Sequence, residues 1–321
     1  MKTRSRFLAF GIAGVALLGI AGARIQARLS AHQSPESEVA SVQASSEFDS
    51  SSRSFGELVK SQSFTLGDGG RVEIDLEDAD VVLETISGPT LELRVYVDAS
   101  DEDRANSVFD DMEFRAVQRG TTVSIVAREP RFDRSEWRNR SHSSVTIVVG
   151  VPRGVEIDAQ TGDGDIDAGD LTSNTSLRSS DGDITVDAFE GGELDVHTSD
   201  GDIFVDRLDG RRAEIRTSDG DIVLRSVRAP IDVSSGDGDI RINLLASSEV
   251  SVSTGDGDIT VTAPADLAAD VYLEGEDLNV AQGLELLGRI RSHSVQGTLN
   301  GGGPNLELRT GDGSITLRQG N

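Results

Sequence analysis

Pairs of aspartates separated by one glycine recur through the second half of the sequence, and their spacing is the feature most able to do chemistry. The six pairs are Asp163/Asp165, Asp181/Asp183, Asp200/Asp202, Asp219/Asp221, Asp237/Asp239 and Asp256/Asp258. Carboxylate oxygens are hard ligands that suit Ca²⁺. The candidate calcium ligands are the four central pairs: Asp181, Asp183, Asp200, Asp202, Asp219, Asp221, Asp237 and Asp239.

A structural interpretation of these pairs competes with the calcium hypothesis. Aspartate is favoured at tight corners because its carboxylate accepts hydrogen bonds from nearby backbone. The calcium-binding nonapeptide coil carries glycine-rich turns every nine residues, whereas this chain has one acidic corner every 18 or 19 residues. The sequence therefore favours a solvated structural corner and predicts no cofactor, with Ca²⁺ kept as the alternative.

Catalysis is not predicted. Glycoside hydrolysis needs two carboxylates in unlike environments, one of them with a raised pKa, whereas these pairs are repeated and equivalent. His197 has no repeated partner, and no serine–histidine–aspartate grouping or phosphate loop is visible. We therefore expect a protein that is not an enzyme and has no catalytic residues.

The aspartate pairs are positioned by a repeat whose final apolar residue serves as its anchor. Successive anchors from Ile166 to Leu278 lie 18 or 19 residues apart, and Ile315 follows in a late copy. A fixed period in this range is the signature of a solenoid. The predicted core anchors are Ile166, Ile184, Ile203, Ile222, Ile240, Ile259, Leu278 and Ile315.

Apolar residues recur in steps of two on either side of the glycine-containing corner, which indicates β-strands rather than helices. For Ile222 they are Ile215, seven residues before it, and Leu224, two residues after it, and Val227 lies five residues after it. By the same spacing, Leu245 is expected to point inward in the coil of Ile240. The copies are too short for βαβ units, so they must pair in parallel. The prediction is an all-β, single-stranded parallel β-solenoid of about 18–19 residues per coil, with a glycine at each corner for positive φ or close backbone approach.

Four segments are predicted along the chain. Residues 1–23 have the basic start, apolar run and small residues of a signal peptide. Residues 24–60 are serine-rich and predict a disordered linker. Residues 61–150 predict an N-terminal β-rich cap with one short helix, whose start is marked by Ser100 followed by three acids. Residues 151–321 predict the solenoid.

Composition restricts the location and the partners. The signal peptide predicts export to the periplasm, the cell surface or the medium, and an uncleaved N-terminal membrane anchor is the minor alternative. The net charge of −26 argues against binding nucleic acid or anionic lipid directly. The sequence has no cysteine, which excludes disulfides, thiolate sites and a lipoprotein anchor.

An exported N-terminus, a strand-rich section, the step Val151-Pro152 and tandem Gly-Asp-Gly-Asp-Ile copies occur in this order. In this arrangement the chain resembles the bacterial family of β-strand-repeat domains named putative adhesins. The resemblance covers roughly residues 61–321. The resemblance implies the β-strand-repeat fold. The family has no catalytic motif whose residues could be carried over to this chain.

These observations predict an exported, non-enzymatic binding or scaffold module of the cell envelope, with an envelope protein or a cell-surface glycan as partner. The alternative is a β-helix that binds or processes polysaccharide, for which the many arginines would contact an acidic glycan. The last repeat, from Leu306 to Leu317, is followed by four residues only. We therefore expect it to be an exposed edge strand that allows self-association.

Overall fold

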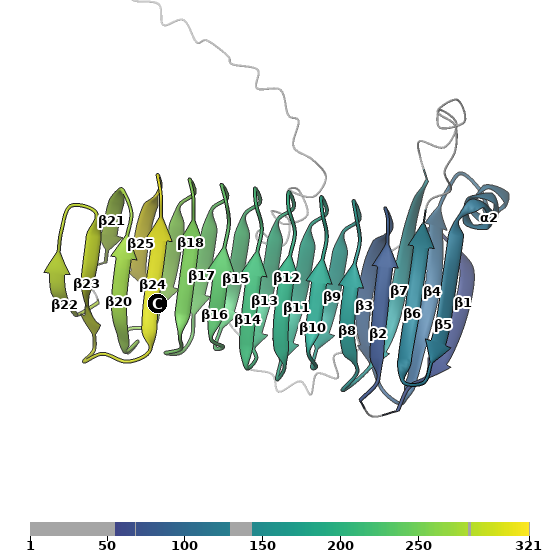
Figure 1. Cartoon of the computed structure of the whole chain (residues 1–321), viewed down its shortest axis with the longest axis horizontal. Coiled ribbons are helices and arrows are strands. Elements are labelled where there is room, and N and C mark those ends of the chain that lie inside the picture. The colour runs from purple at the N-terminus through teal and green to yellow at the C-terminus, as the bar shows by residue number, and fades with distance from the viewer. Residues whose placement is uncertain (1–54, 68, 129–142, 282–283, 321) are drawn as a thin grey trace, which may run out of the picture. The chain divides into compact units, whose positions relative to one another are not determined.

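The computed structural model describes residues 55–67, 69–128, 143–281 and 284–320. The predicted signal peptide and most of the predicted linker lie outside these residues. Within them the fold is a stack of β-coils, each of which contributes one strand to each of two facing sheets (Figure 1). None of the described helices is long and apolar enough to cross a membrane.

The central repeats form the predicted solenoid. One sheet receives β9 (Ile166–Leu171), β11 (Ile184–Glu190), β13 (Ile203–Asp209), β15 (Ile222–Val227), β17 (Ile240–Leu244) and β19 (Ile259–Ala263). The other receives β8 (Glu156–Gln160), β10 (Thr175–Arg178), β12 (Glu193–His197), β14 (Arg212–Arg216), β16 (Ile231–Ser234) and β18 (Val250–Thr254). Adjacent strands are parallel and anchors pair with anchors, for example Ile203 with Ile184 and Ile222.

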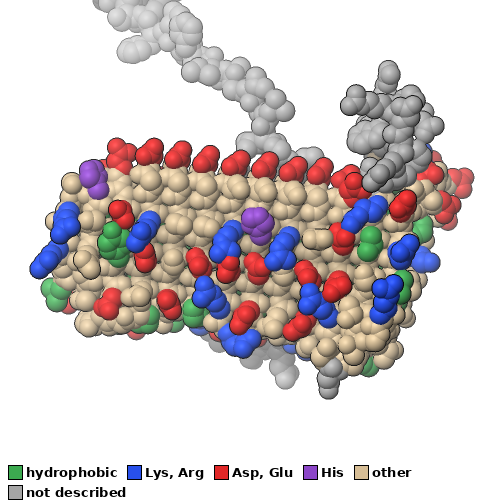
Figure 2. Space-filling view, viewed as in Figure 1, with side chains coloured by type: hydrophobic (Ala, Val, Ile, Leu, Met, Phe, Trp, Pro, Cys, Tyr) green, Lys and Arg blue, Asp and Glu red, His purple; other side chains and the backbone are tan. Residues whose placement is uncertain are grey.

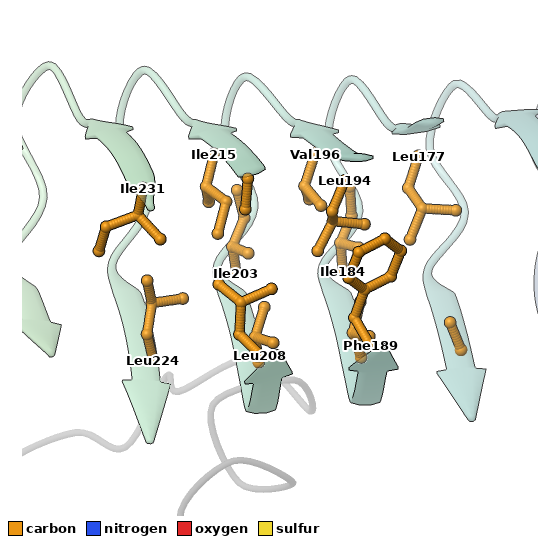
Figure 3. Close-up of a cluster of buried hydrophobic side chains, with 14 of the residues drawn as sticks. Leu177, Ile184, Phe189, Leu194, Val196, Ile203, Leu208, Ile215, Leu224 and Ile231 are labelled. Atoms are coloured by element: carbon orange, nitrogen blue, oxygen red, sulfur yellow. The ribbon is translucent and has the colours of Figure 1, made fainter. Parts of the chain in front are cut away.

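Side chains from the two sheets meet between them to form one continuous core. Figure 3 shows Leu177, Val196 and Ile215 from one sheet directed toward Ile184, Ile203 and Leu224 from the other. The anchors Ile166, Ile184, Ile203, Ile222, Ile240, Ile259 and Ile315 are at most 1% exposed. Leu278 is only partly buried, because its strand lies at the edge of its sheet. The predicted apolar ladder is therefore confirmed.

One core prediction is wrong by a single residue. Leu245 was expected to point inward, but it is 39% exposed, and Leu244 is buried in its place. Leu244 pairs with Val227 after a shift in register between β15 and β17. The irregular pairing removes one residue from this coil, so the side chain that faces the core changes.

The N-terminal section caps the stack, and part of it already has coil geometry. Its strands are β1 (Glu57–Thr65), β2 (Arg71–Leu76), β3 (Asp80–Ile86), β4 (Thr90–Asp98), β5 (Glu113–Arg119), β6 (Thr122–Arg128) and β7 (Ser144–Pro152). β2 pairs in parallel with β8, and β3 pairs in parallel with β9. Coil pairing therefore begins before residue 151. Residues 57–60 belong to β1, which pairs with β4, so the linker prediction is wrong for them.

The predicted short helix is α2 (Glu102–Asp111). Asp101 caps it, because its carboxylate accepts a hydrogen bond of 2.8 Å from the backbone N–H of Arg104. The helix contacts β1 and β4. Glu102 and Asp103 in the first turn also suit the positive end of the helix dipole.

Strand order at the C-terminal end differs from the chain order. The strands are β20 (Ala269–Glu274), β21 (Asp277–Val280), β22 (Leu286–Ile290), β23 (Ser294–Leu299), β24 (Asn305–Thr310) and β25 (Ser314–Gln319). β24 lies between β18 and β20, and β25 lies between β19 and β21. The expectation that the last repeat is an edge strand is therefore wrong, because both of its strands are paired on both sides.

Candidate functional site

The repeated corner joins a strand of one sheet to a strand of the other, and close backbone contact determines its composition. A Cβ added to Gly220 would lie 1.9 Å from the carbonyl oxygen of Gly201, and one added to Gly201 would lie 2.1 Å from that of Gly182. None of these corner glycines has a positive φ. Glycine is therefore needed at the corner because two backbones approach closely there, and not because of a positive φ.

Buried hydroxyl groups connect each corner to the preceding one. Thr217 Oγ1 donates to the carbonyl oxygen of Gly201 at 3.1 Å and accepts from the backbone N–H of Gly220 at 3.2 Å. Ser235 makes the equivalent bonds to Gly220 and Gly238, each of 3.0 Å. The threonine or serine that begins each motif therefore satisfies backbone groups that the tight corner would otherwise leave buried and unpaired.

The second aspartate of each motif forms a hydrogen-bonded ladder, and we call these residues the inner aspartates. They are Asp165, Asp183, Asp202, Asp221, Asp239 and Asp258. Oδ1 of Asp202 accepts from the backbone N–H of Asp221 at 2.8 Å, and Oδ1 of Asp221 accepts from that of Asp239 at 2.8 Å. The pattern extends to Ser314, whose N–H donates to Asp258 Oδ1 at 2.8 Å. The inner aspartates are therefore structural parts of the coil stack.

The first aspartate of each motif is exposed, and we call these residues the outer aspartates. They are Asp163, Asp181, Asp200, Asp219, Asp237 and Asp256. Figure 2 shows a regular row of acidic side chains along one edge of the stack. Strands in neighbouring coils lie about 4.8 Å apart, so this corner presents a closely spaced linear array of carboxylates. The two aspartates of a pair thus have different environments.

One earlier copy of the corner was not predicted from the sequence. The side chain of Asp80 is bonded to the backbone of the first full motif, because its Oδ1 accepts a hydrogen bond from the N–H of Asp165 at 3.1 Å. Asp78 lies next to Asp163, and burial, together with the charges of Asp163 and Glu77, raises its pKa above the ordinary value of 3.8. The signal was present as Asp78-Ala79-Asp80-Val81, with buried Ile74 seven residues before Val81. This copy was not recognised because Ala79 stands where the later copies have glycine.

Two inner aspartates have shifted pKa values in opposite directions. Burial raises the pKa of Asp202 above 3.8, although the hydrogen bond from Asp221 opposes this shift. Hydrogen bonds from the backbone N–H and hydroxyl of Ser314 lower the pKa of the Asp258 carboxyl. Asp258 adjoins the one late copy that carries serine instead of a second aspartate.

The calcium candidates are brought into columns but not into clusters. Among the described residues, no group of three or more histidine, cysteine, aspartate or glutamate side chains is arranged to hold a metal ion. Oδ1 of each inner candidate, Asp183, Asp202, Asp221 and Asp239, already accepts a backbone hydrogen bond. Calcium binding stays the untested alternative to a structural corner, and its test falls on the exposed outer candidates Asp181, Asp200, Asp219 and Asp237.

Arginines on the outward faces of the sheets contact acids of neighbouring coils. Arg178 lies 2.5 Å from Asp195 and 3.5 Å from Asp158. Arg241 lies 2.7 Å from Asp239 and 3.3 Å from Asp221, so it connects two inner aspartates. These ion pairs offset part of the acidic charge of the stack.

The residues from the N-terminal cap to the last coil also match a known family model. The model is described as Toastrack DUF4097, and it matches residues 70–318. The chain belongs to this family. The predicted resemblance to a β-strand-repeat family is thereby confirmed, and the match begins at the earlier coil formed by β2 and β3.

Solved structures similar to this toastrack protein carry descriptions that refer to adhesion or to lipid. A "putative adhesin" from Bacteroides fragilis is 15% identical, with 82% of this chain and 97% of that chain covered and a TM-score of 0.42. A "putative adhesin" from Parabacteroides distasonis is 14% identical, with 83% and 98% covered and a TM-score of 0.39. A "putative lipid binding protein" from the same species is 15% identical, with 82% and 96% covered and a TM-score of 0.39. No curated protein matches the chain.

Proposed function

We propose that this toastrack protein is an exported, non-enzymatic scaffold or binding module of the bacterial cell envelope. The observation that carries the proposal is the exposed row of outer aspartates, one per coil, on a continuously packed and hydrogen-bonded stack. A rigid row of evenly spaced carboxylates suits attachment to an extended, positively charged partner, because many weak contacts then add along one line. An envelope protein with a basic surface has this chemistry.

The equivalence of the outer aspartates supports a function without catalysis. An active site needs groups whose environments differ from their neighbours', whereas each outer aspartate occupies the same position in its own coil and is exposed. The proposed function therefore requires no cofactor.

Binding or processing of an acidic polysaccharide is the second candidate, and one observation favours it. Arg178, His197 and Arg216 occupy the same row of three adjacent strands on the outward face of their sheet. Arg178 is paired with Asp158 and Asp195, and Arg216 is paired with Glu214. These acids compete with a glycan for the guanidinium groups, so we place this function second.

The test uses the full chain in a bacterial host. Cell fractionation is expected to place it in the envelope or the medium, and retention in the cytoplasm would contradict export. Purified chain is then incubated with isolated envelopes, with and without Ca²⁺. Changing Asp181, Asp200, Asp219 and Asp237 to asparagine is expected to reduce the bound fraction severalfold.

The matched control removes the same number of charges from exposed acids outside the row. It changes Glu190 and Glu249 to glutamine, and Asp209 and Asp266 to asparagine. Equal loss of binding in both variants would mean that net charge, not the row of outer aspartates, drives attachment. Binding of an anionic glycan that is lost in an Arg178→Ala/Arg216→Ala variant, or cleavage of that glycan, would favour the second candidate.

A further inference from the structure

Strand β22 ends one sheet at the C-terminal side of the stack, and one of its edges has no strand partner among the described residues. It lies beside β23 on its other edge (Figure 1). The two strands pair antiparallel, with Gly288 opposite Gly297. An open strand edge is a template for another strand.

β22 also carries the two most exposed large apolar side chains of the described residues. Leu287 is 75% exposed and Ile290 is 78% exposed. The edge strand at the opposite end of the same sheet, β5, differs because its most exposed large apolar residue, Val117, is 38% exposed. Its sequence, EFRAVQR, also carries charges that discourage pairing. Within this sheet, the most exposed large apolar side chains therefore lie at the β22 end.

The hydrogen-bonding pattern shows which groups β22 offers. The backbone N–H of Arg291 donates to the carbonyl oxygen of Ser294 at 2.8 Å, so this pair is a hydrogen-bonded one. In antiparallel sheets such pairs alternate with pairs whose N–H and C=O groups point to the opposite edges. The backbone groups of Gly288 and Ile290 therefore point toward the open edge, as does the carbonyl oxygen of Leu286.

A second copy of this strand is complementary to the first under a twofold axis through Gly288. Leu286 then lies opposite Ile290 of the second copy, and Leu287 lies opposite Arg289. Glu285 lies opposite Arg291, so each dimer contains two such pairs of opposite charge. A twofold interface requires a patch that is complementary to itself, and this segment meets the requirement in apolar character, charge and hydrogen bonding.

We propose that two copies of this chain associate through antiparallel pairing of β22, so that one sheet continues from one molecule into the other. This pairing is independent of the proposed function. It places self-association at β22 rather than at the last repeat, whose strands are enclosed by neighbouring coils.

Sedimentation velocity on the full chain over a wide concentration range is the first test. A monomer–dimer equilibrium is expected, with no larger species, because the twofold pairing uses the open β22 edge of both molecules. A monomer at every concentration would overturn the proposal. Species that keep growing with concentration would also overturn it, since they indicate head-to-tail stacking.

Substitutions at Ile290 test the hydrogen bonds. Ile290→Pro removes an N–H that points to the open edge and leaves the bonds to β23 in place. It is expected to weaken dimerisation roughly 10- to 100-fold, because two edge bonds are lost per dimer. The control, Ile290→Ala, keeps the N–H and is expected to weaken it less. A dimer unchanged by proline would refute the pairing.

Charge reversal tests the register without depending on a change in backbone. Glu285→Arg or Arg291→Glu alone places like charges opposite each other twice and is expected to weaken dimerisation roughly tenfold. Mixing these two single variants restores opposite charges in the mixed dimer, which is expected to form preferentially. Thermal unfolding of each variant confirms that the monomer is intact. Absence of preference for the mixed dimer would exclude this register.

Discussion

Glycine and aspartate in the same corner motif have separate physical functions. The glycine allows two backbones to approach, since a Cβ at Gly220 would lie 1.9 Å from a carbonyl oxygen. The inner aspartate provides an acceptor for the next coil, as Asp202 does for Asp221. The motif therefore persists through the stack because each copy is in contact with the one before it.

Gly220→Ala is expected to destabilise the fold by about 1–3 kcal/mol or more, because the methyl group has no space without a backbone shift. Gly67→Ala is the control, since a Cβ there would meet nothing within 4 Å and φ is not positive. Urea unfolding measures both. Equal stability of the two variants would contradict the close approach seen in the corner.

The shifted pKa values of Asp202 and Asp258 predict opposite dependences on pH. Because the pKa of Asp202 is raised in the folded protein, acidification between that raised value and 3.8 favours the fold. The pKa of Asp258 is lowered, so its carboxylate stabilises the fold above 3.8, and this contribution is lost as the pH falls through the lowered value.

Substitution by asparagine tests this difference at neutral pH. Asp202→Asn keeps an acceptor oxygen for Asp221 and removes a poorly solvated charge, so the free energy of unfolding is expected to rise. Asp258→Asn removes a charge that two hydrogen bonds from Ser314 stabilise, so the free energy of unfolding is expected to fall. Urea unfolding at pH 7 distinguishes them, and shifts of the same sign would show that charge is not the cause.

At the scale of the element, stability comes from strands whose apolar side chains pack in the core between those of the neighbouring coils. Ile222 has neighbouring anchors on both sides, in β13 and β17, and is 0% exposed. Ile222→Ala is expected to reduce stability by about 2–5 kcal/mol. Leu245→Ala, at a side chain that is 39% exposed, is expected to change it by about 0.5 kcal/mol or less. An Ile222→Ala variant as stable as wild type would contradict the stacked core.

Strands β24 and β25 are interior elements, although they come last in the chain. Ending the chain after residue 304 would remove a layer from between β18/β19 and β20/β21. It would expose buried Ile259 and Leu273. We therefore expect loss of amide protection in β18 to β21, measured by hydrogen exchange. Unchanged protection there would indicate that the ordering of coils at this end is incorrect.

At the scale of the whole molecule, the net charge of −26 and the row of outer aspartates make stability sensitive to salt. Unit charges about 4.8 Å apart repel by roughly 1 kcal/mol in water. Sodium chloride is therefore expected to raise the melting temperature, and calcium at matched ionic strength is expected to add little. A saturable increase with calcium that a chelator reverses, and that is lost when Asp181, Asp200, Asp219 and Asp237 become asparagine, would instead establish the outer aspartates as ligands.

The repeat itself was determined by the sequence. Eight copies of one pattern reinforce a signal that would be weak in any single strand, so the coil length, the inward anchors and the parallel pairing could be predicted from residues such as Ile203 and Ile222. Each anchor also had to face the core, because a shift of one residue in the register would turn it to the outer face of the coil. The short helix was predictable for a local reason, since acids at its start satisfy backbone N–H groups.

The order of coils at the C-terminal end was decided only by the tertiary structure. Every coil offers the same kind of edge, so the motif around Ile315 is as compatible with the end of the stack as with a position between β19 and β21. Closing the longer connection costs little additional entropy, and insertion gives β24 and β25 partners on both sides. The different environments of Asp200 and Asp202, and the exchange of Leu245 for Leu244, likewise depend on contacts between coils. Local pattern specifies how a coil is built, and only the packing of coils against one another fixes which edge each one occupies.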